Sequence, residues 1–132
     1  MNGINLWAVV AAAVSAFLLG GLWYSAALFG KAWQREAGRS DEELKARSPA
    51  AMFGLSLLLS LVAAYVFAMF LGPAPALGFS LGAGAAAGLF WVAASFGINY
   101  LFEARSLKLF VINGGYHTLQ FTLYGLILGL WH

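Results

Sequence analysis

The chain has 132 residues, of which 62% are hydrophobic and 9% are charged. Soluble domains carry about 25% charged residues, and a chain this short cannot hide so much apolar surface in water. The composition therefore predicts an integral membrane protein. The net charge of +2 is too small to indicate a nucleic-acid partner, and the lack of cysteine excludes disulfides, thiolate metal sites and cysteine catalysis.

Four apolar stretches follow one another along the chain, each with about the 20 residues that a ~30 Å hydrocarbon core requires. They cover approximately residues 4–28, 50–71, 77–102 and 109–131. No basic residue precedes the first stretch, so we expect a retained helix rather than a cleaved signal peptide. The expected fold is an all-α membrane protein, a single domain (residues 1–132) in which four transmembrane helices form an antiparallel bundle.

The first connection, residues 29–49, is polar and contains two helix signals. Apolar and basic residues alternate before residue 36, which predicts a short amphipathic segment in the lipid headgroup layer. Ser40 and Glu43 match a capping box, so a second short helix is expected to begin there. Ser48 before Pro49, and Ser106, are the predicted N-caps of the second and fourth spans. Headgroup contacts are expected from Lys31, Trp33, Arg35 and Arg39.

All seven basic residues lie in the first and third connections. These two connections share one side of the membrane if each apolar stretch crosses once. The positive-inside rule places both in the cytoplasm. The prediction is therefore a multi-pass protein of the inner or plasma membrane, with both termini and the Gly72–Pro75 turn outside the cytoplasm.

Two stretches carry a resemblance to a known family. The first is Gly21-Leu22-Trp23-Tyr24-Ser25 followed by Gly30-Lys31 and Trp33, and the second is Asn99-Tyr100-Leu101-Phe102-Glu103 with Asn113 and Gly115-Tyr116-His117. Together they resemble a bacterial membrane family catalogued as domain of unknown function 1761. The resemblance covers essentially the whole chain and implies a four-helix membrane protein without implying an activity. Ala26 departs from the pattern, in which proline is expected.

Polar residues inside the last two spans form two stripes. Four of them recur at i, i+4, i+7 and i+11 and share one helical face: Asn113, His117, Gln120 and Tyr124. On the third span Ser95 and Asn99 are four residues apart. Helical rise gives the two stripes matching depths across a short hairpin, so we predict that they face each other. Tyr24 and Ser25 are expected to join them near the cytoplasmic end.

Two interpretations of these stripes remain open. Interhelical hydrogen bonding predicts a dry, fully paired contact between the third and fourth helices. A transport pathway predicts a water-filled opening toward the cytoplasm around His117, the one group at membrane depth that titrates near neutral pH. No nucleophile, phosphate-loop or metal-ligand constellation is present in the sequence, so neither an enzyme nor a cofactor or metal is expected.

Glycine pairs provide a further packing signal. The small-xxx-small pairs are Gly78-x-x-x-Gly82, Gly84-x-x-x-Gly88 and Gly125-x-x-x-Gly129. The first two pairs lie on different faces of the third span, so one face can pack within the bundle while the other meets a second copy. We therefore expect membrane lipids and a homo-oligomer as partners, with an unidentified solute or membrane protein as a further partner. The predicted function is a non-enzymatic binding or interaction bundle, and the alternative is a small-solute or proton transporter.

The two halves of the chain also echo each other. Gly21-x-x-Tyr24 precedes the first connection, as Gly97-x-x-Tyr100 precedes the third. Both halves would run in the same direction through the membrane, so the echo favours a parallel repeat.

Overall fold

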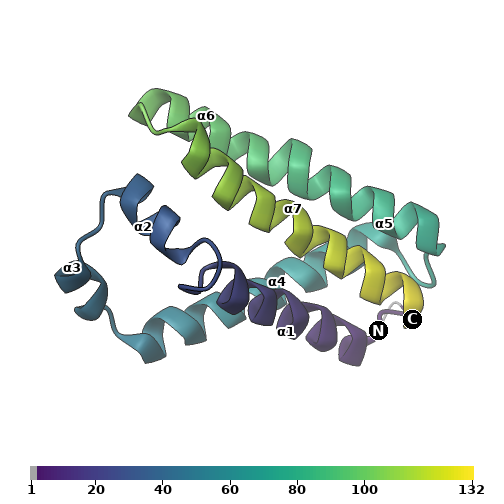
Figure 1. Cartoon of the computed structure of the whole chain (residues 1–132). Coiled ribbons are helices and arrows are strands. Elements are labelled where there is room, and N and C mark those ends of the chain that lie inside the picture. Colours follow the sequence, from purple (N-terminus) through teal and green to yellow (C-terminus); the bar gives the residue numbers. More distant parts are fainter. Residues whose placement is uncertain (1–2) are drawn as a thin grey trace.

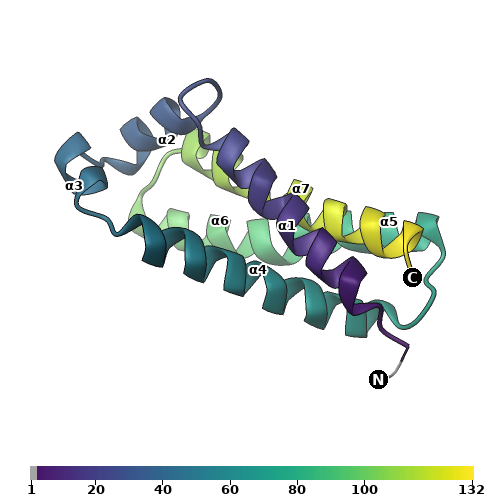
Figure 2. The same ribbon diagram turned by 90° about the horizontal axis from the view of Figure 1, so that it is seen from below.

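The computed structural model describes residues 3–132, and this range is helical without any strand. Long helical rods lie side by side, and two short helices lie at the end of the molecule remote from both termini (Figures 1 and 2). The elements are α1 (Leu6–Trp23), α2 (Gly30–Ala37), α3 (Asp41–Lys45), α4 (Pro49–Leu71), α5 (Leu77–Ala86), η1 (Ala87–Ala93), α6 (Ala94–Glu103) and α7 (Leu107–Leu130).

Three helices, and not the predicted four, are long and apolar enough to cross a membrane. They are Leu6–Trp23, Pro49–Leu71 and the continuous rod Leu77–Glu103, which comprises α5, η1 and α6. The fourth predicted stretch does form a helix, α7, of 24 residues. Its polar residues lower its mean hydropathy, and two of them, Gln120 and Tyr124, are buried inside the protein. The low mean hydropathy of α7 therefore reflects polar side chains that are buried against other helices.

The predicted helix caps are confirmed. Ser40 and Glu43 form both hydrogen bonds of a capping box at the start of α3. The side chains of Ser48 and Ser106 accept hydrogen bonds from backbone N–H groups in the first turns of α4 and α7. These caps satisfy N–H groups that have no partner within their own helices, which fixes where the helices begin.

The first predicted span, residues 4–28, extends beyond the C-terminal end of the helix that forms there. The helix α1 stops at Trp23, and residues 24–29 form a tight turn. The N–H of Phe29 donates to the carbonyl of Trp23, and the N–H of Gly30 donates to the carbonyl of Ser25. A Cβ atom at Gly30 would overlap the carbonyl oxygen of Tyr24, so this turn requires glycine. Hydropathy cannot detect such a turn, because residues 26–29 are apolar.

The core in which α1 packs against α4 and α7 contains many small side chains. Ala8, Ala12 and Ala16 on α1 are fully buried, as is Ala64 on α4. Small residues at regular spacing let helix backbones approach closely, which increases van der Waals contact in a membrane, where hydrophobic burial does not drive association.

The contact between α5 and α7 is closer still. A Cβ atom at Gly84 would overlap the carbonyl oxygen of Phe121, and one at Gly125 would overlap the carbonyl oxygen of Ser80. The Ser80 hydroxyl, which is fully buried, donates to the carbonyl of Gly125. The two backbones therefore touch directly at these glycines.

The π-helical segment η1 changes the register of the third rod. A π turn holds one more residue than an α turn and often marks a functional position. Gly84 and Gly88 pack against α7, and the next contact comes five residues later, at Ala93, which lies against Gly114. Gly97 then contacts Phe110. Every residue after η1 is thus displaced around the rod by one position relative to an uninterrupted α-helix.

The α5–α7 contact gives a testable prediction. Replacing Gly84 with alanine should destabilise the protein by about 1–3 kcal/mol, because the new methyl group has no room against the backbone of α7. The matched control is Gly82→Ala on the same helix, where the space around the Cβ position is open. That control should be neutral or slightly stabilising, since alanine favours the helix. Thermal unfolding of the purified variants in detergent measures both, and equal melting temperatures would contradict the described contact.

Candidate functional site

A chain of hydrogen bonds crosses the protein interior from α7 to α4 and α1. His117 Nδ1 lies 2.6 Å from Gln120 Oε1, and Gln120 Nε2 donates to the Tyr124 hydroxyl at 2.7 Å. The Tyr124 hydroxyl lies 2.7 Å from the Ser60 hydroxyl, which donates to the carbonyl of Ala13 at 3.1 Å. Tyr124 is fully buried, and Gln120 and Ser60 are nearly so. Three helices are therefore joined by one polar chain.

The acceptor at the end of this series determines which group donates in each hydrogen bond. A backbone carbonyl only accepts, so Ser60 donates to Ala13. The Tyr124 hydroxyl then donates to Ser60, whose hydroxyl and carbonyl oxygens both lie within reach, and Gln120 donates to Tyr124 through its amide nitrogen. The Gln120 oxygen must then accept from His117, whose proton lies on Nδ1. The His117 ring stacks on Phe96, with ring centres 5.0 Å apart. His117 is thus a half-buried side chain that packs on Phe96 and donates one hydrogen bond.

A second polar junction surrounds Asn113, near the N-terminal end of α7. The Tyr24 hydroxyl donates to Asn113 Oδ1 at 2.6 Å, and Asn113 Nδ2 donates to the Tyr100 hydroxyl at 2.6 Å. One residue earlier, the carbonyl of Ile112 accepts from the indole N–H of Trp23 at 2.9 Å. The end of α1 and the end of α6 are therefore both fixed to α7 at one level.

The prediction that Ser95 and Asn99 face the last helix is wrong. Both residues are exposed, and the Ser95 hydroxyl donates to the carbonyl of Trp91 within its own helical rod. The extra residue in η1 turns them outward and brings Gly97 and Tyr100 inward in their place. Ser25 also lies outside the network, since its hydroxyl donates to the carbonyl of Leu22. Tyr24, Asn113, His117, Gln120 and Tyr124 do lie within the two hydrogen-bonded junctions.

Sequence reasoning missed Ser60 and Tyr100. Ser60 is one of two serines within an otherwise apolar helix, and such a hydroxyl is itself a signal of interhelical hydrogen bonding. The sequence places Tyr100 in the family pattern and in the Gly97-x-x-Tyr100 echo, but predicts no hydrogen bond for it. Its role depends on the register shift in η1, which leaves no clear mark in the sequence.

The predicted glycine pairs divide between two environments. Gly84, Gly88, Gly125 and Gly129 lie in the contact between the third rod and α7, whereas Gly78 and Gly82 have open space around them. In residues 3–132, no group of three or more histidine, aspartate or glutamate side chains is placed to share a metal ion.

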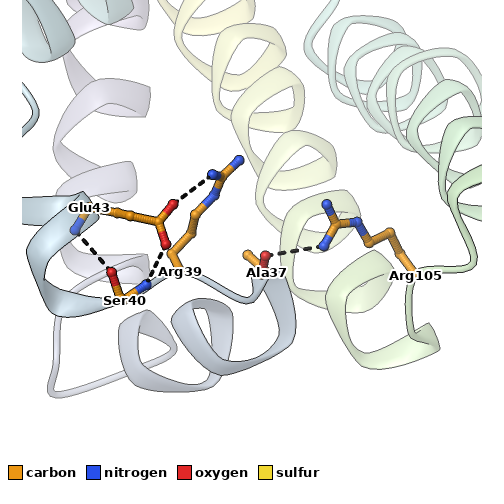
Figure 3. A network of polar contacts seen from close by, with 5 residues as sticks. All are labelled: Ala37, Arg39, Ser40, Glu43 and Arg105. Carbon is orange, nitrogen blue, oxygen red and sulfur yellow. Dashed lines mark hydrogen bonds and ion pairs between the residues drawn. The ribbon is translucent and has the colours of Figure 1, made fainter.

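The two basic connections meet at one end of the molecule. Arg105 donates through Nη1 to the carbonyl of Ala37 at the end of α2 (Figure 3). Ser106 donates to the Glu36 carboxylate. Beside them, Arg39 pairs with Glu43 at 3.1 Å. The backbone N–H of Ser40, and then Arg39, lower the pKa of the Glu43 carboxyl. Of the other predicted headgroup residues, Lys31 and Arg35 are exposed, and the Trp33 ring packs edge-on against Tyr24.

The comparison with known families decides the identity of the chain. A family described as protein of unknown function (DUF1761) matches residues 7–129. The chain belongs to this family. Among curated proteins and solved structures, none matches this DUF1761 chain.

The fold explains why two distant stretches carry the DUF1761 resemblance. Trp23 and Tyr24 of the first stretch bond directly to residues 112 and 113, next to the second stretch. Gly115 is in contact with the Trp23 ring, and the Tyr116 hydroxyl donates to the carbonyl of Ala16. The two stretches thus form a single junction between α1, α6 and α7.

The interior hydrogen-bond chain gives a second prediction. Tyr124→Phe removes the hydroxyl that joins Gln120 to Ser60, and should lower the free energy of unfolding by about 0.6–2 kcal/mol. The matched control is Tyr65→Phe on α4, because within residues 3–132 the Tyr65 hydroxyl makes no hydrogen bond, so little change is expected. A double-mutant cycle with Ser60→Ala, read by thermal unfolding in detergent, isolates the coupling. Additive effects would contradict the direct Tyr124–Ser60 bond.

Proposed function

We propose that this chain is a non-enzymatic membrane protein that acts as an interaction bundle, packing through its third rod against a second copy of itself. Three helices are long and apolar enough to cross a membrane, which suggests a membrane location. The proposal adds α7 as a fourth crossing, places both connections that carry basic residues in the cytoplasm, and places the termini outside.

The burial pattern of α7 supports its role as a central crossing. With 24 residues it is about 36 Å long, enough for a ~30 Å hydrocarbon core. Gln120 and Tyr124 hydrogen-bond inside the protein, so a membrane location would not expose these groups to lipid. Polar residues within membrane helices commonly face the interior in this way.

The joined connections support a common side for all basic residues. Arg105 and Ser106 in the third connection bond to the end of α2 in the first. Both termini lie at the opposite end (Figure 1). The positive-inside rule then assigns the α2–α3 end to the cytoplasm.

The outward face of the third rod is the observation that carries the proposed self-association. Gly78, Gly82 and Ala86 recur every four residues and are all exposed, which leaves a flat strip on α5. A second copy packed on this strip would let two backbones meet at the glycines.

The experiment measures self-association in liposomes by energy transfer between labelled copies at a fixed protein-to-lipid ratio. Gly82→Leu should weaken association by about tenfold, which corresponds to ~1.4 kcal/mol, because the larger side chain separates the strips. The matched control is Gly54→Leu on α4, where glycine is likewise exposed with open space around it. Unchanged transfer for Gly82→Leu, or an equal loss for Gly54→Leu, would refute the proposed interface.

The alternative function, passage of protons or small solutes around His117, has one feature in its favour. His117, Gln120, Tyr124 and Ser60 form an unbroken series of groups with exchangeable hydrogens. However, the series ends on the carbonyl of Ala13, which can accept a hydrogen bond but cannot pass a proton onward. The fully paired interior therefore favours the structural interpretation.

Proton flux separates the two functions. Liposomes that hold the wild-type protein and a pH-sensitive dye should show no flux above protein-free liposomes. His117→Leu should leave that baseline unchanged while lowering the thermal stability. Transport would instead require wild-type flux that His117→Leu abolishes without loss of assembly, and this result would overturn the proposed function.

A further inference from the structure

An open cleft lies at the α2–α3 end, outside the helical core. Its volume is about 560 Å³, and its lining consists of Trp33, Arg39, Glu43, Leu44, Ala46 and Arg47. This volume lies within the ~300–1,000 Å³ range of small-molecule sites. The cleft combines an apolar wall with two guanidinium groups, so its chemistry is that of a site for an amphiphilic anion.

The charges in the cleft are unequal. Glu43 is already engaged, since its carboxylate accepts from Arg39 Nη1 and from the backbone N–H of Ser40 (Figure 3). Arg47 donates through Nε to the carbonyl of Leu44, and within residues 3–132 no acidic side chain pairs with it. The terminal nitrogens of Arg47 therefore carry the uncompensated positive charge of the cleft. A guanidinium fork of this kind matches the geometry of a phosphate group.

The position of the cleft indicates which class of phosphate compound it would bind. Trp33 packs against Tyr24, directly after the end of the apolar helix α1. Arg47 lies two residues before Pro49, where the apolar helix α4 begins. The cleft thus borders two helices at the level where they would leave the hydrocarbon core, and tryptophan is enriched at that level. A phosphate held there would belong to a lipid whose apolar part lies along Trp33 and Leu44.

We infer that this cleft binds the headgroup of an anionic phospholipid, with Arg47 as the phosphate-binding residue. The inference rests on the membrane embedding proposed above. Embedding is tested separately by carbonate extraction of membranes. Release of the protein would contradict embedding, whereas a retained protein whose lipid binding ignores Arg47 would contradict only the cleft.

The test is native mass spectrometry of the detergent-solubilised full-length protein titrated with phosphatidylglycerol. Phosphatidylcholine with the same acyl chains serves as the zwitterionic comparison. Arg47→Gln should weaken the first phosphatidylglycerol site about tenfold, the effect of losing one charge-assisted contact. Arg47→Lys, which keeps the charge but not the fork, should give a smaller loss. The matched control is Lys108→Gln, because Lys108 is an exposed basic residue that lies outside the cleft; it should bind as wild type does.

Four results would overturn the inference. An equal loss in Lys108→Gln would indicate general charge attraction, and equal binding of phosphatidylcholine would remove the requirement for net negative charge. Displacement of phosphatidylglycerol by sn-glycerol 3-phosphate at matched concentration would assign the site to a water-soluble phosphate ester. Circular dichroism of Arg47→Gln verifies that the helices are intact, and a normal spectrum with wild-type lipid binding would likewise refute the assignment.

Discussion

The arrangement of this protein depends on satisfying the polar atoms of α7 inside the protein. Within residues 3–132, every buried side-chain nitrogen or oxygen has a hydrogen-bond partner. An unpaired polar group in an apolar interior costs several times what a paired one contributes, so Tyr124 and Asn113 restrict which helices can surround α7. Ser60 on α4 and Tyr100 on α6 meet these requirements from two sides. Because directional bonds allow few alternatives, they define the packing more narrowly than apolar contacts can.

Close backbone contact makes these bonds geometrically accessible. Glycines on both α5 and α7 let the two helices touch, and the Ser80 hydroxyl then reaches a carbonyl on the opposite helix. On the other side of α7, the fully buried alanines of α1 bring the carbonyl of Ala13 within reach of Ser60. Small residues and polar residues therefore act together: the first shorten the distances between helices, and the second fix their register.

Local signals in the sequence predict most of the fold, but not its register. The capping serines mark the starts of α3, α4 and α7 correctly, and Gly72 marks the end of α4, because caps depend on neighbouring residues only. The turn after Trp23 escaped prediction, since its cause is the close approach at Gly30 within an apolar stretch. The outward placement of Asn99 also escaped, because η1 inserts one residue into the third rod. Prediction thus succeeds where the cause is local and fails where tertiary contacts select the conformation.

The junction at Asn113 gives the internal echo of the sequence a physical meaning. Tyr24 and Tyr100 occupy corresponding positions in the two halves of the chain, and both bond to the same side chain. The amide uses its oxygen for one tyrosine and its nitrogen for the other, so leucine at position 113 could serve neither. Tyr24 also packs against Trp33, which lines the cleft on α2. The Tyr24–Asn113 hydrogen bond therefore helps to position α2, together with the bonds that Arg105 and Ser106 make to the end of this helix. A change at Asn113 would reach the cleft through Tyr24 and Trp33.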